Sequence, residues 1–273
     1  MRRRDCQLLA VLAVSIVLAS CSRLTFVKPD ASRGKVDRVA PEYNIRETPR
    51  DKNAAAARRH EMLAEERLRN GQWQAAEAEA RLALKANPGS ATAHTLLAMI
   101  EERNGRAVQA GAHYSRATEL APTSGAMLNN YGAWLCGNGR ASESLAWFDR
   151  ALQDPGYGSR ASALANAGAC AGLAGDHGRV ARDLRAALAL DPANGVALLA
   201  MAEHALRNGS YMEARAFSER RLASGPATAQ LLLVASQIET KLGDKAAAAR
   251  YVQRLHREFP QARTAHSGES SPP

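Results

Sequence analysis

Residues 57–90 read ARRHEMLAEERLRNGQWQAAEAEARLALKANPGS, and residues 91–124 read ATAHTLLAMIEERNGRAVQAGAHYSRATELAPTS. The two stretches align without a gap, so that a small residue, a glycine and a proline recur 34 positions apart. Self-similarity at a fixed period of about 20 to 50 residues is typical of arrays in which one short unit stacks on the next. This repeat therefore decides the fold class.

The glycine and the proline recur to the end of the chain. Glycines stand at Gly71, Gly105, Gly139, Gly175, Gly209 and Gly243, with spacings of 34, 34, 36, 34 and 34. Prolines stand at Pro88, Pro122, Pro155, Pro192, Pro226 and Pro260, with a one-residue shift at Pro155. A 34-residue period is that of the tetratricopeptide repeat, a pair of helices A and B joined by a tight turn. The sequence predicts an all-α fold, a right-handed superhelix (solenoid) of six tetratricopeptide repeats over residues 57–260.

Small residues recur where the two helices of a repeat are expected to cross closely. On helix A this position holds Ala64, Ala98, Gly132, Gly168, Ala202 and Ser236. On helix B the first such position holds Ala76, Ala110, Ser144, Val180, Ala214 and Ala248. A second position on helix B holds alanine at 83, 117, 151 and 187, but Arg221 and Leu255 in the last two repeats. We attribute these two departures to the terminal place of those repeats.

Two residues are inserted between the third and fourth repeats, near Pro155-Gly156-Tyr157-Gly158. The insertion predicts a longer loop at this point and a local change in the superhelix.

Composition agrees with helices packed through alanine. Hydrophobic residues make up 46% of the chain but aromatic residues only 5%, which disfavours a β-sandwich built from branched and aromatic side chains. The formal charge is +9, to which residues 2–5 contribute +3 − 1 = +2, leaving +7 for the rest. The basic residues are scattered among carboxylates, and no basic run alternates with aromatics. We therefore do not expect nucleic acid as a partner.

The N-terminus has the pattern of a lipoprotein signal peptide, which we assign to residues 1–20. Arginines at positions 2–4 precede an apolar stretch from Leu8 to Ala19, which is too short for a permanent membrane span. The stretch ends in Leu18-Ala19-Ser20-Cys21, which resembles a bacterial lipobox, so Cys21 is the expected lipidation site. An ordinary secretory signal with an incidental cysteine is the alternative. Ser22 resembles the sorting residue that permits transfer to the outer membrane.

Two further segments flank the repeats. Residues 21–56 are mixed in charge, contain Pro29, Pro41 and Pro49, and show no sustained apolar period, so we interpret them as the lipidated N-terminus and a linker. Residues 261–273 are rich in serine and proline and are expected to be a disordered tail.

Three segments resemble the type IV pilus biogenesis lipoproteins, or pilotins, of the PilF/PilW type. They are LNNYGAWLC at 128–136, DPGYGSRASALANAGAC at 154–170 and RLHREFPQA at 254–262. The resemblance covers nearly the whole mature chain. It implies a lipid-anchored scaffold on the periplasmic face of the outer membrane, which binds the pilus secretin and supports its assembly or localisation. A scaffold for another envelope assembly, such as barrel insertion or cell-wall machinery, is the alternative.

Two cysteines remain in the repeats after Cys6 leaves with the signal peptide and Cys21 takes lipid. Cys136 and Cys170 lie 34 residues apart on helices A of neighbouring repeats, and the periplasm is oxidising, so a disulfide between them is feasible. Similar pilotins carry a cysteine pair in these segments. Two buried free thiols are the alternative.

The inner helices of such arrays line a groove that is the default partner surface. By the repeat register, the predicted groove residues are Glu61, Glu65, Thr95, Met99, Asn129, Asn130, Ala133, Ala165, Ala169, Leu199 and Glu203. Asn129 and Asn130 can bind the backbone of an extended partner segment, or one of them can brace a contact between repeats. The groove lacks the Lys and Asn pairing of carboxylate-clamp repeats, so a chain terminus is not the expected ligand.

No catalytic or metal-ligating pattern accompanies the repeats. The seven histidines have no metal-ligand spacing, and neither a nucleophile elbow nor a phosphate-binding loop is present. His60 and His94 share one repeat position and are interpreted as packing residues. The sequence predicts a protein that is not an enzyme and needs no cofactor and no metal.

Overall fold

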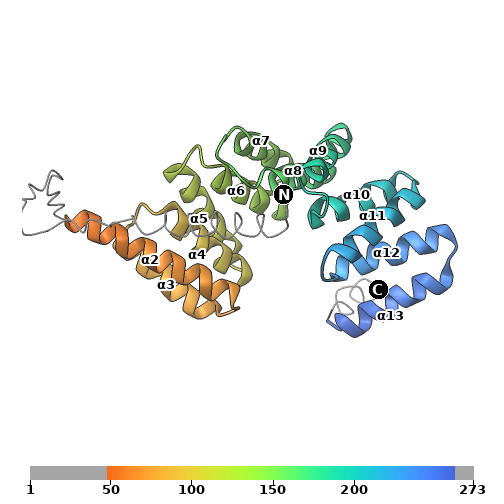
Figure 1. The fold of residues 1–273 in the computed structure, drawn as a ribbon, viewed down its shortest axis with the longest axis horizontal. Coiled ribbons are helices and arrows are strands. Elements are labelled where there is room, and N and C mark those ends of the chain that lie inside the picture. Colours follow the sequence, from red (N-terminus) through yellow and green to blue (C-terminus); the bar gives the residue numbers. More distant parts are fainter. Residues whose placement is uncertain (1–47, 262–273) are drawn as a thin grey trace, which may run out of the picture. The chain divides into compact units, whose positions relative to one another are not determined.

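The structure is a computed structural model that describes residues 48–261. This part of the chain consists of twelve α-helices joined by short loops, without β-strands (Figure 1). The helices are α2 (Pro49–Arg69), α3 (Trp73–Ala86), α4 (Ala91–Arg103), α5 (Ala107–Leu120), α6 (Gly125–Gly137), α7 (Ala141–Leu152), α8 (Arg160–Ala174), α9 (His177–Leu190), α10 (Gly195–Arg207), α11 (Tyr211–Ser224), α12 (Ala229–Leu242) and α13 (Lys245–Glu258).

The helices pack in consecutive pairs, α2 with α3 through α12 with α13, and each pair is one repeat. The even-numbered helices are helices A of their repeats, and each of them also contacts helix A of a neighbouring repeat. The pairs follow one another in chain order (Figure 1). The predicted superhelix of six tetratricopeptide repeats is confirmed.

The recurring glycines form the turns between helices A and B. All six have φ in the left-handed region, from 70° at Gly71 to 83° at Gly243, and no other residue between 48 and 261 does. This conformation costs glycine little because it has no Cβ. Each recurring proline lies two or three residues beyond the end of a helix B, where it cannot continue the helix.

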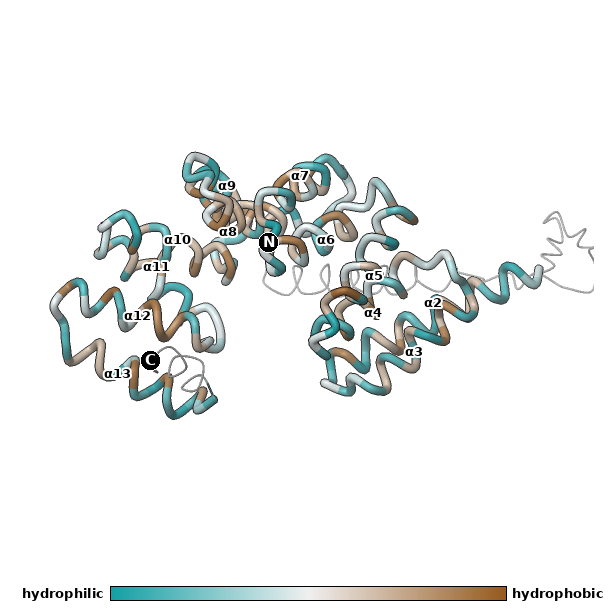
Figure 2. Tube along the Cα trace, turned by 180° about the vertical axis from the view of Figure 1, so that it is seen from behind, coloured by the Kyte–Doolittle hydropathy of each residue, from teal (hydrophilic) through white to brown (hydrophobic). Residues whose placement is uncertain are grey.

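The small residues mark the crossing points of the helices. Every residue at the helix A position and at the first helix B position is buried. Figure 2 shows apolar and polar residues alternating along each helix, so each repeat buries one side of its helices in the shared core. At Gly168, a Cβ would lie 2.6 Å from Cγ of the fully buried Leu184. The close approach of α8 to α9 therefore depends on glycine at this position.

Gly168→Ala is expected to lower the free energy of unfolding by about 1–2 kcal/mol, because overpacking outweighs the gain in helix propensity. Gly137→Ala is the matched control, since a Cβ at Gly137 would have no neighbour within 4 Å. Urea unfolding of both variants measures the difference. A Gly168→Ala protein as stable as the Gly137→Ala protein would show that α8 and α9 have room to separate.

The two inserted residues lengthen the loop between α7 and α8, as the sequence predicts. Tyr157 of this loop is buried and lies over the start of α6, where a Cβ on Gly125 would lie 2.6 Å from its ring. Asp154 accepts hydrogen bonds from the backbone N–H groups of Gly125 (2.8 Å) and Gly156 (2.9 Å), and these bonds lower the pKa of its carboxyl. The insertion thus ties the third repeat to the loop that follows it.

The start of the first helix differs from the prediction. We expected a linker to residue 56, but α2 begins at Pro49. The Thr48 side chain accepts a hydrogen bond from Asp51 N–H, the Asp51 carboxylate accepts one from Thr48 N–H, and Pro49 fits the first helical turn. The signal peptide, Cys21 and nearly all of the tail lie outside the described residues. Within residues 48–261, no helix is both long and apolar enough to cross a bilayer.

Candidate protein-binding face

The candidate site is the surface formed by helices A, namely α2, α4, α6, α8, α10 and α12, which we call the A face. Because successive helices A contact one another, their exposed residues form one continuous surface. Two hollows lie along it. The N-terminal hollow lies mainly between α4 and α6, and the C-terminal hollow lies around α10.

Six of the predicted groove residues line these hollows. Met99, Asn130 and Ala133 line the N-terminal hollow, which has a volume of about 490 Å³. Ala169, Leu199 and Glu203 line the C-terminal hollow, of about 420 Å³. These six residues of the predicted groove thus fall into two hollows of the A face.

The N-terminal hollow is rich in aromatic rings. Trp73 and Trp134 line it, and the guanidinium of Arg103 lies 4.2 Å from the centre of the Trp73 ring, in cation–π contact. The hydroxyl of buried Tyr114 donates a 3.1 Å hydrogen bond to Glu102. Burial, with the nearby Glu102 carboxylate, raises the pKa of Tyr114 above its ordinary value. Tyr114 therefore stays protonated at neutral pH and acts as a donor.

Trp134 is held from two sides. Its ring is stacked with Tyr131, with centroids 5.8 Å apart, and it packs over Gly111, where a Cβ would lie 2.4 Å from the indole. Its Nε1 is buried and has no hydrogen-bond partner within residues 48–261. The hollow thus offers a rigid apolar wall beside the exposed Met99.

The C-terminal hollow is smaller and mostly aliphatic. Val196 is 48% exposed and lies beside Leu199 of the same helix, with Ala169 contributed by α8. Polar groups stand at its rim, among them Arg221 of α11 and Glu203, which accepts a 2.9 Å hydrogen bond from Gln230. The combination suits an aliphatic side chain flanked by polar groups.

Three predicted groove residues are buried instead of lining the groove. Ala165 is fully buried, because it packs with small residues of α10, Ala197 and Ala200, and the two helices close over it. Thr95 is buried: its hydroxyl donates a 3.0 Å hydrogen bond to the Ala91 carbonyl and lies 2.9 Å from the Met127 sulfur.

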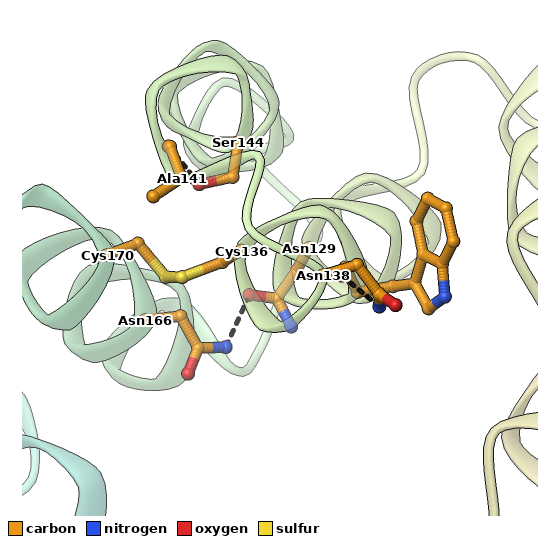
Figure 3. Close-up of a disulfide and its surroundings, with 8 residues drawn as sticks. Asn129, Cys136, Asn138, Ala141, Ser144, Asn166 and Cys170 are labelled. Carbon is orange, nitrogen blue, oxygen red and sulfur yellow. Dashed lines mark hydrogen bonds between the residues drawn. A yellow bond between two sulfur atoms is a disulfide. The ribbon is translucent and has the colours of Figure 1, made fainter. Parts of the chain in front are cut away.

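Asn129 is the third buried residue, and it braces two repeats. Its Oδ1 accepts a 3.1 Å hydrogen bond from Nδ2 of Asn166, which joins α6 to α8 (Figure 3). Of the two roles considered for the asparagine pair, Asn129 therefore takes the bracing role. Asn130 is half-buried and lines the N-terminal hollow, where its amide can contact a partner.

The two glutamates at the first repeat lie outside both hollows. Glu61 accepts a hydrogen bond from the Ser90 hydroxyl, which also accepts one from Ala93 N–H at the start of α4. Glu65 is exposed and lies 4.0 Å from Arg69. The two groove positions that we predicted on α2 therefore hold polar side chains with partners inside the protein.

A disulfide joins Cys136 of α6 to Cys170 of α8, with the Cα atoms 5.9 Å apart (Figure 3). Both cysteines belong to a buried cluster that includes Phe148 and Ala167. The bond and the Asn129–Asn166 hydrogen bond together fix the A face at the junction next to the insertion.

The two histidines that share a repeat position have partners that also share a repeat position. His60 lies 2.7 Å from Glu79, and His94 lies 2.9 Å from His113 between their Nδ1 atoms, so each links helix A to helix B of its repeat. Residues 48–261 contain no group of three or more histidine, cysteine or carboxylate side chains that could hold a metal. These contacts fit the packing role that we expected.

We expect the protein to lose stability as the pH falls through the range in which free histidine titrates. Burial lowers the pKa of His94 and of His113, and for His94 the charge of His113 adds to the effect. Because the unfolded chain binds protons at a higher pH, about 6.5, the stability is present above that pH and is lost as the pH falls toward the folded pKa.

The measurement is the urea midpoint between about pH 7.5 and pH 5.5, in the wild type and in the His94→Gln/His113→Gln variant. The double variant should show a weaker pH dependence. His204, whose pKa is also lowered by burial, accounts for a remaining slope. Identical pH profiles of the urea midpoint in the wild type and the double variant would contradict a contribution of His94 and His113 to the pH dependence of stability.

Sequence reasoning missed several residues of the two hollows. Trp73 begins a helix B, and Arg103 and Trp134 lie near the C-terminal ends of helices A, outside the repeat positions that we assigned to the groove. Arg221 had a visible signal, since it replaces an alanine of the repeat pattern. Its place at the C-terminal hollow was not visible in the sequence.

Comparisons with known proteins agree with this architecture. The tetratricopeptide repeat family matches residues 61–125 and 199–263. The crystal structure of PilW, a widely conserved type IV pilus biogenesis factor, is 30% identical, with 75% of this chain and 94% of PilW covered and a TM-score of 0.66. The chain belongs to the PilW family.

Other solved structures share the fold. PilF of Pseudomonas aeruginosa is 24% identical, with 79% of this chain and 99% of PilF covered and a TM-score of 0.65. A tetratricopeptide repeat protein of Parabacteroides merdae is 17% identical, with 74% and 78% covered and a TM-score of 0.60. No curated protein matches the sequence. The chain is thus a tetratricopeptide protein related to type IV pilus biogenesis factors.

Proposed function

We propose that this protein is a pilotin: a lipoprotein of the outer membrane that binds the secretin of the type IV pilus and supports its assembly or localisation. The observation that carries the proposal is membership of the PilW family, since PilW is itself a pilus biogenesis factor. The role is that of a binding scaffold and not of an enzyme.

The A face supports this function physically. Its two hollows present apolar side chains between polar groups, as protein-binding surfaces do. The disulfide and the Asn129–Asn166 bond hold α6 against α8, so the surface is fixed before a partner binds. A fixed surface suits a scaffold because the protein loses little conformational entropy when a partner binds.

The anchor is proposed from the N-terminal sequence. Cys21 follows a lipobox-like stretch, and Ser22 fits transfer to the outer membrane. More than one acyl chain gives stable attachment, at about 0.8 kcal/mol for each buried methylene. The protein would then reside on the periplasmic face, where the disulfide is stable.

A deletion strain tests the proposal. Loss of the protein should abolish detergent-resistant secretin multimers in the outer membrane, and the full chain supplied in trans should restore them. Cys21→Ser should fail to incorporate labelled palmitate and should restore fewer multimers at the same protein level. Normal multimers in the deletion strain would refute the pilotin role. Copurification with barrel-assembly or cell-wall proteins would then favour the other envelope scaffold.

A further inference from the structure

The feature that carries a further inference is Arg221, at the rim of the C-terminal hollow. Four repeats have a buried alanine at the equivalent position: Ala83, Ala117, Ala151 and Ala187. The fifth repeat has an arginine whose side chain passes out of the core toward the A face. A cation at the place of a core alanine requires a specific environment.

Two glycines provide that environment. A Cβ on Gly195 would lie 2.9 Å from Nε of Arg221, and a Cβ on Gly225 would lie 3.5 Å from its Nη1. Both glycines have ordinary negative or extended φ, so neither is needed for a turn. They leave room for the guanidinium, which lies along the hollow beside Val196.

Arg221 has no anionic partner within residues 48–261. Three half-buried arginines, by contrast, do pair with acids: Arg179 with Asp149 and Asp183, Arg215 with Glu239, and Arg254 with Glu258. Among the residues that the structure describes, no carboxylate lies within ion-pair distance of Arg221, and no acceptor takes a hydrogen bond from its guanidinium. Glu203, also at the rim, is bonded to Gln230.

A partly buried guanidinium beside an aliphatic surface is complementary to a carboxylate next to an aliphatic side chain. The planar group can donate two parallel hydrogen bonds to one carboxylate, and these bonds are stronger where water is partly excluded. Val196 and Leu199 give the neighbouring aliphatic side chain a place to bind. Arg221 is the only cationic group in the lining of the C-terminal hollow within residues 48–261, so the hollow fits an Asp or Glu side chain better than a chain terminus, which clamp repeats hold with several groups.

We propose that the C-terminal hollow binds an internal, extended segment of a partner protein in which an acidic residue neighbours a small aliphatic residue, with Arg221 holding the carboxylate. This inference rests on the proposed scaffold function and adds the kind of segment that is bound.

The direct test is fluorescence anisotropy with the full chain and a labelled, acetylated and amidated peptide in which one glutamate stands between valines. The wild type should bind this peptide at least about tenfold more tightly than the same peptide with glutamine, because a charge-assisted pair is lost. Arg221→Ala should remove that preference. Arg220→Gln, on the exposed side of the same helix, should keep it.

Folding does not obscure this test, because Arg221→Ala installs the residue found at four equivalent positions. Its thermal midpoint should stay near that of the wild type. Equal binding of the two peptides by the wild type, or an unchanged preference in Arg221→Ala, would overturn the proposal. Tighter binding of a valine peptide with a free C-terminal carboxylate and no glutamate would also overturn it, in favour of a chain terminus.

The secretin assay distinguishes failure of this binding proposal from failure of the proposed pilotin function. If the deletion strain keeps its multimers, the pilotin role fails, whereas the peptide preference can still be measured. If Arg221→Ala restores full multimers while deletion abolishes them, the pilotin role stands and the C-terminal hollow is not the secretin site.

Discussion

Reduction of the Cys136–Cys170 disulfide is expected to lower the free energy of unfolding by about 3–4 kcal/mol. The bond closes a loop across a sequence separation of 34 residues, and its loss restores that freedom to the unfolded chain. For an array of this size the thermal midpoint should fall by roughly 6–16 °C. Urea unfolding with and without a thiol reductant measures the effect.

A variant without the bond provides the control. Cys136→Ala/Cys170→Ala should unfold at the same urea concentration with and without reductant, close to the reduced wild type. A wild-type midpoint that does not respond to full reduction, verified by thiol counting, would contradict a stabilising role. The bond would then serve only to fix the A face.

The second large effect is expected at Phe148, which is fully buried. Its ring packs on Gly132, where a Cβ would lie 2.9 Å away, and belongs to the cluster around the disulfide. Phe148→Ala should lower the free energy of unfolding by about 3–5 kcal/mol, because it leaves a cavity between repeats three and four. Urea unfolding of the full chain is the measurement.

Two further substitutions calibrate this result. Phe148→Leu should cost less, about 1–2 kcal/mol, because most of the volume is kept. Val108→Ala, at a residue 83% exposed, should change the stability by less than about 0.5 kcal/mol. A Phe148→Ala protein within about 1 kcal/mol of the wild type would mean that the repeats close over the cavity.

The repeat architecture was predictable because backbone geometry acts at fixed positions. A positive φ at Gly71 and its five equivalents is a local requirement, and a proline after helix B is another, so their spacing predicts the twelve helices, although not where α2 begins. The inserted loop at Pro155 followed from the same spacing. These features depend on residues near one another in sequence.

The details of the A face were less predictable because they depend on distances between repeats. Ala165 and Ala169 share one helix side, yet Ala165 is fully buried because small residues let α10 approach it, whereas Ala169 is half-buried and lines the C-terminal hollow. Arg221 stood out as a break in the pattern, but only the structure relates it to Gly195. The sequence does contain a local signal for the early start of α2, the capping box of Thr48 and Asp51, but the repeat period does not reveal it.

The central claim is that the protein supports secretin assembly through its A face. The most direct measurement is the amount of detergent-resistant secretin multimer in a deletion strain supplied with either of two double variants. Met99→Glu/Val196→Glu places charge in both hollows, whereas Val108→Glu/Met212→Glu places it at exposed apolar residues of α5 and α11, which are B helices. At equal protein levels, the A-face variant should lack multimers and the B-helix variant should form them. Normal multimers with the A-face variant would contradict the claim.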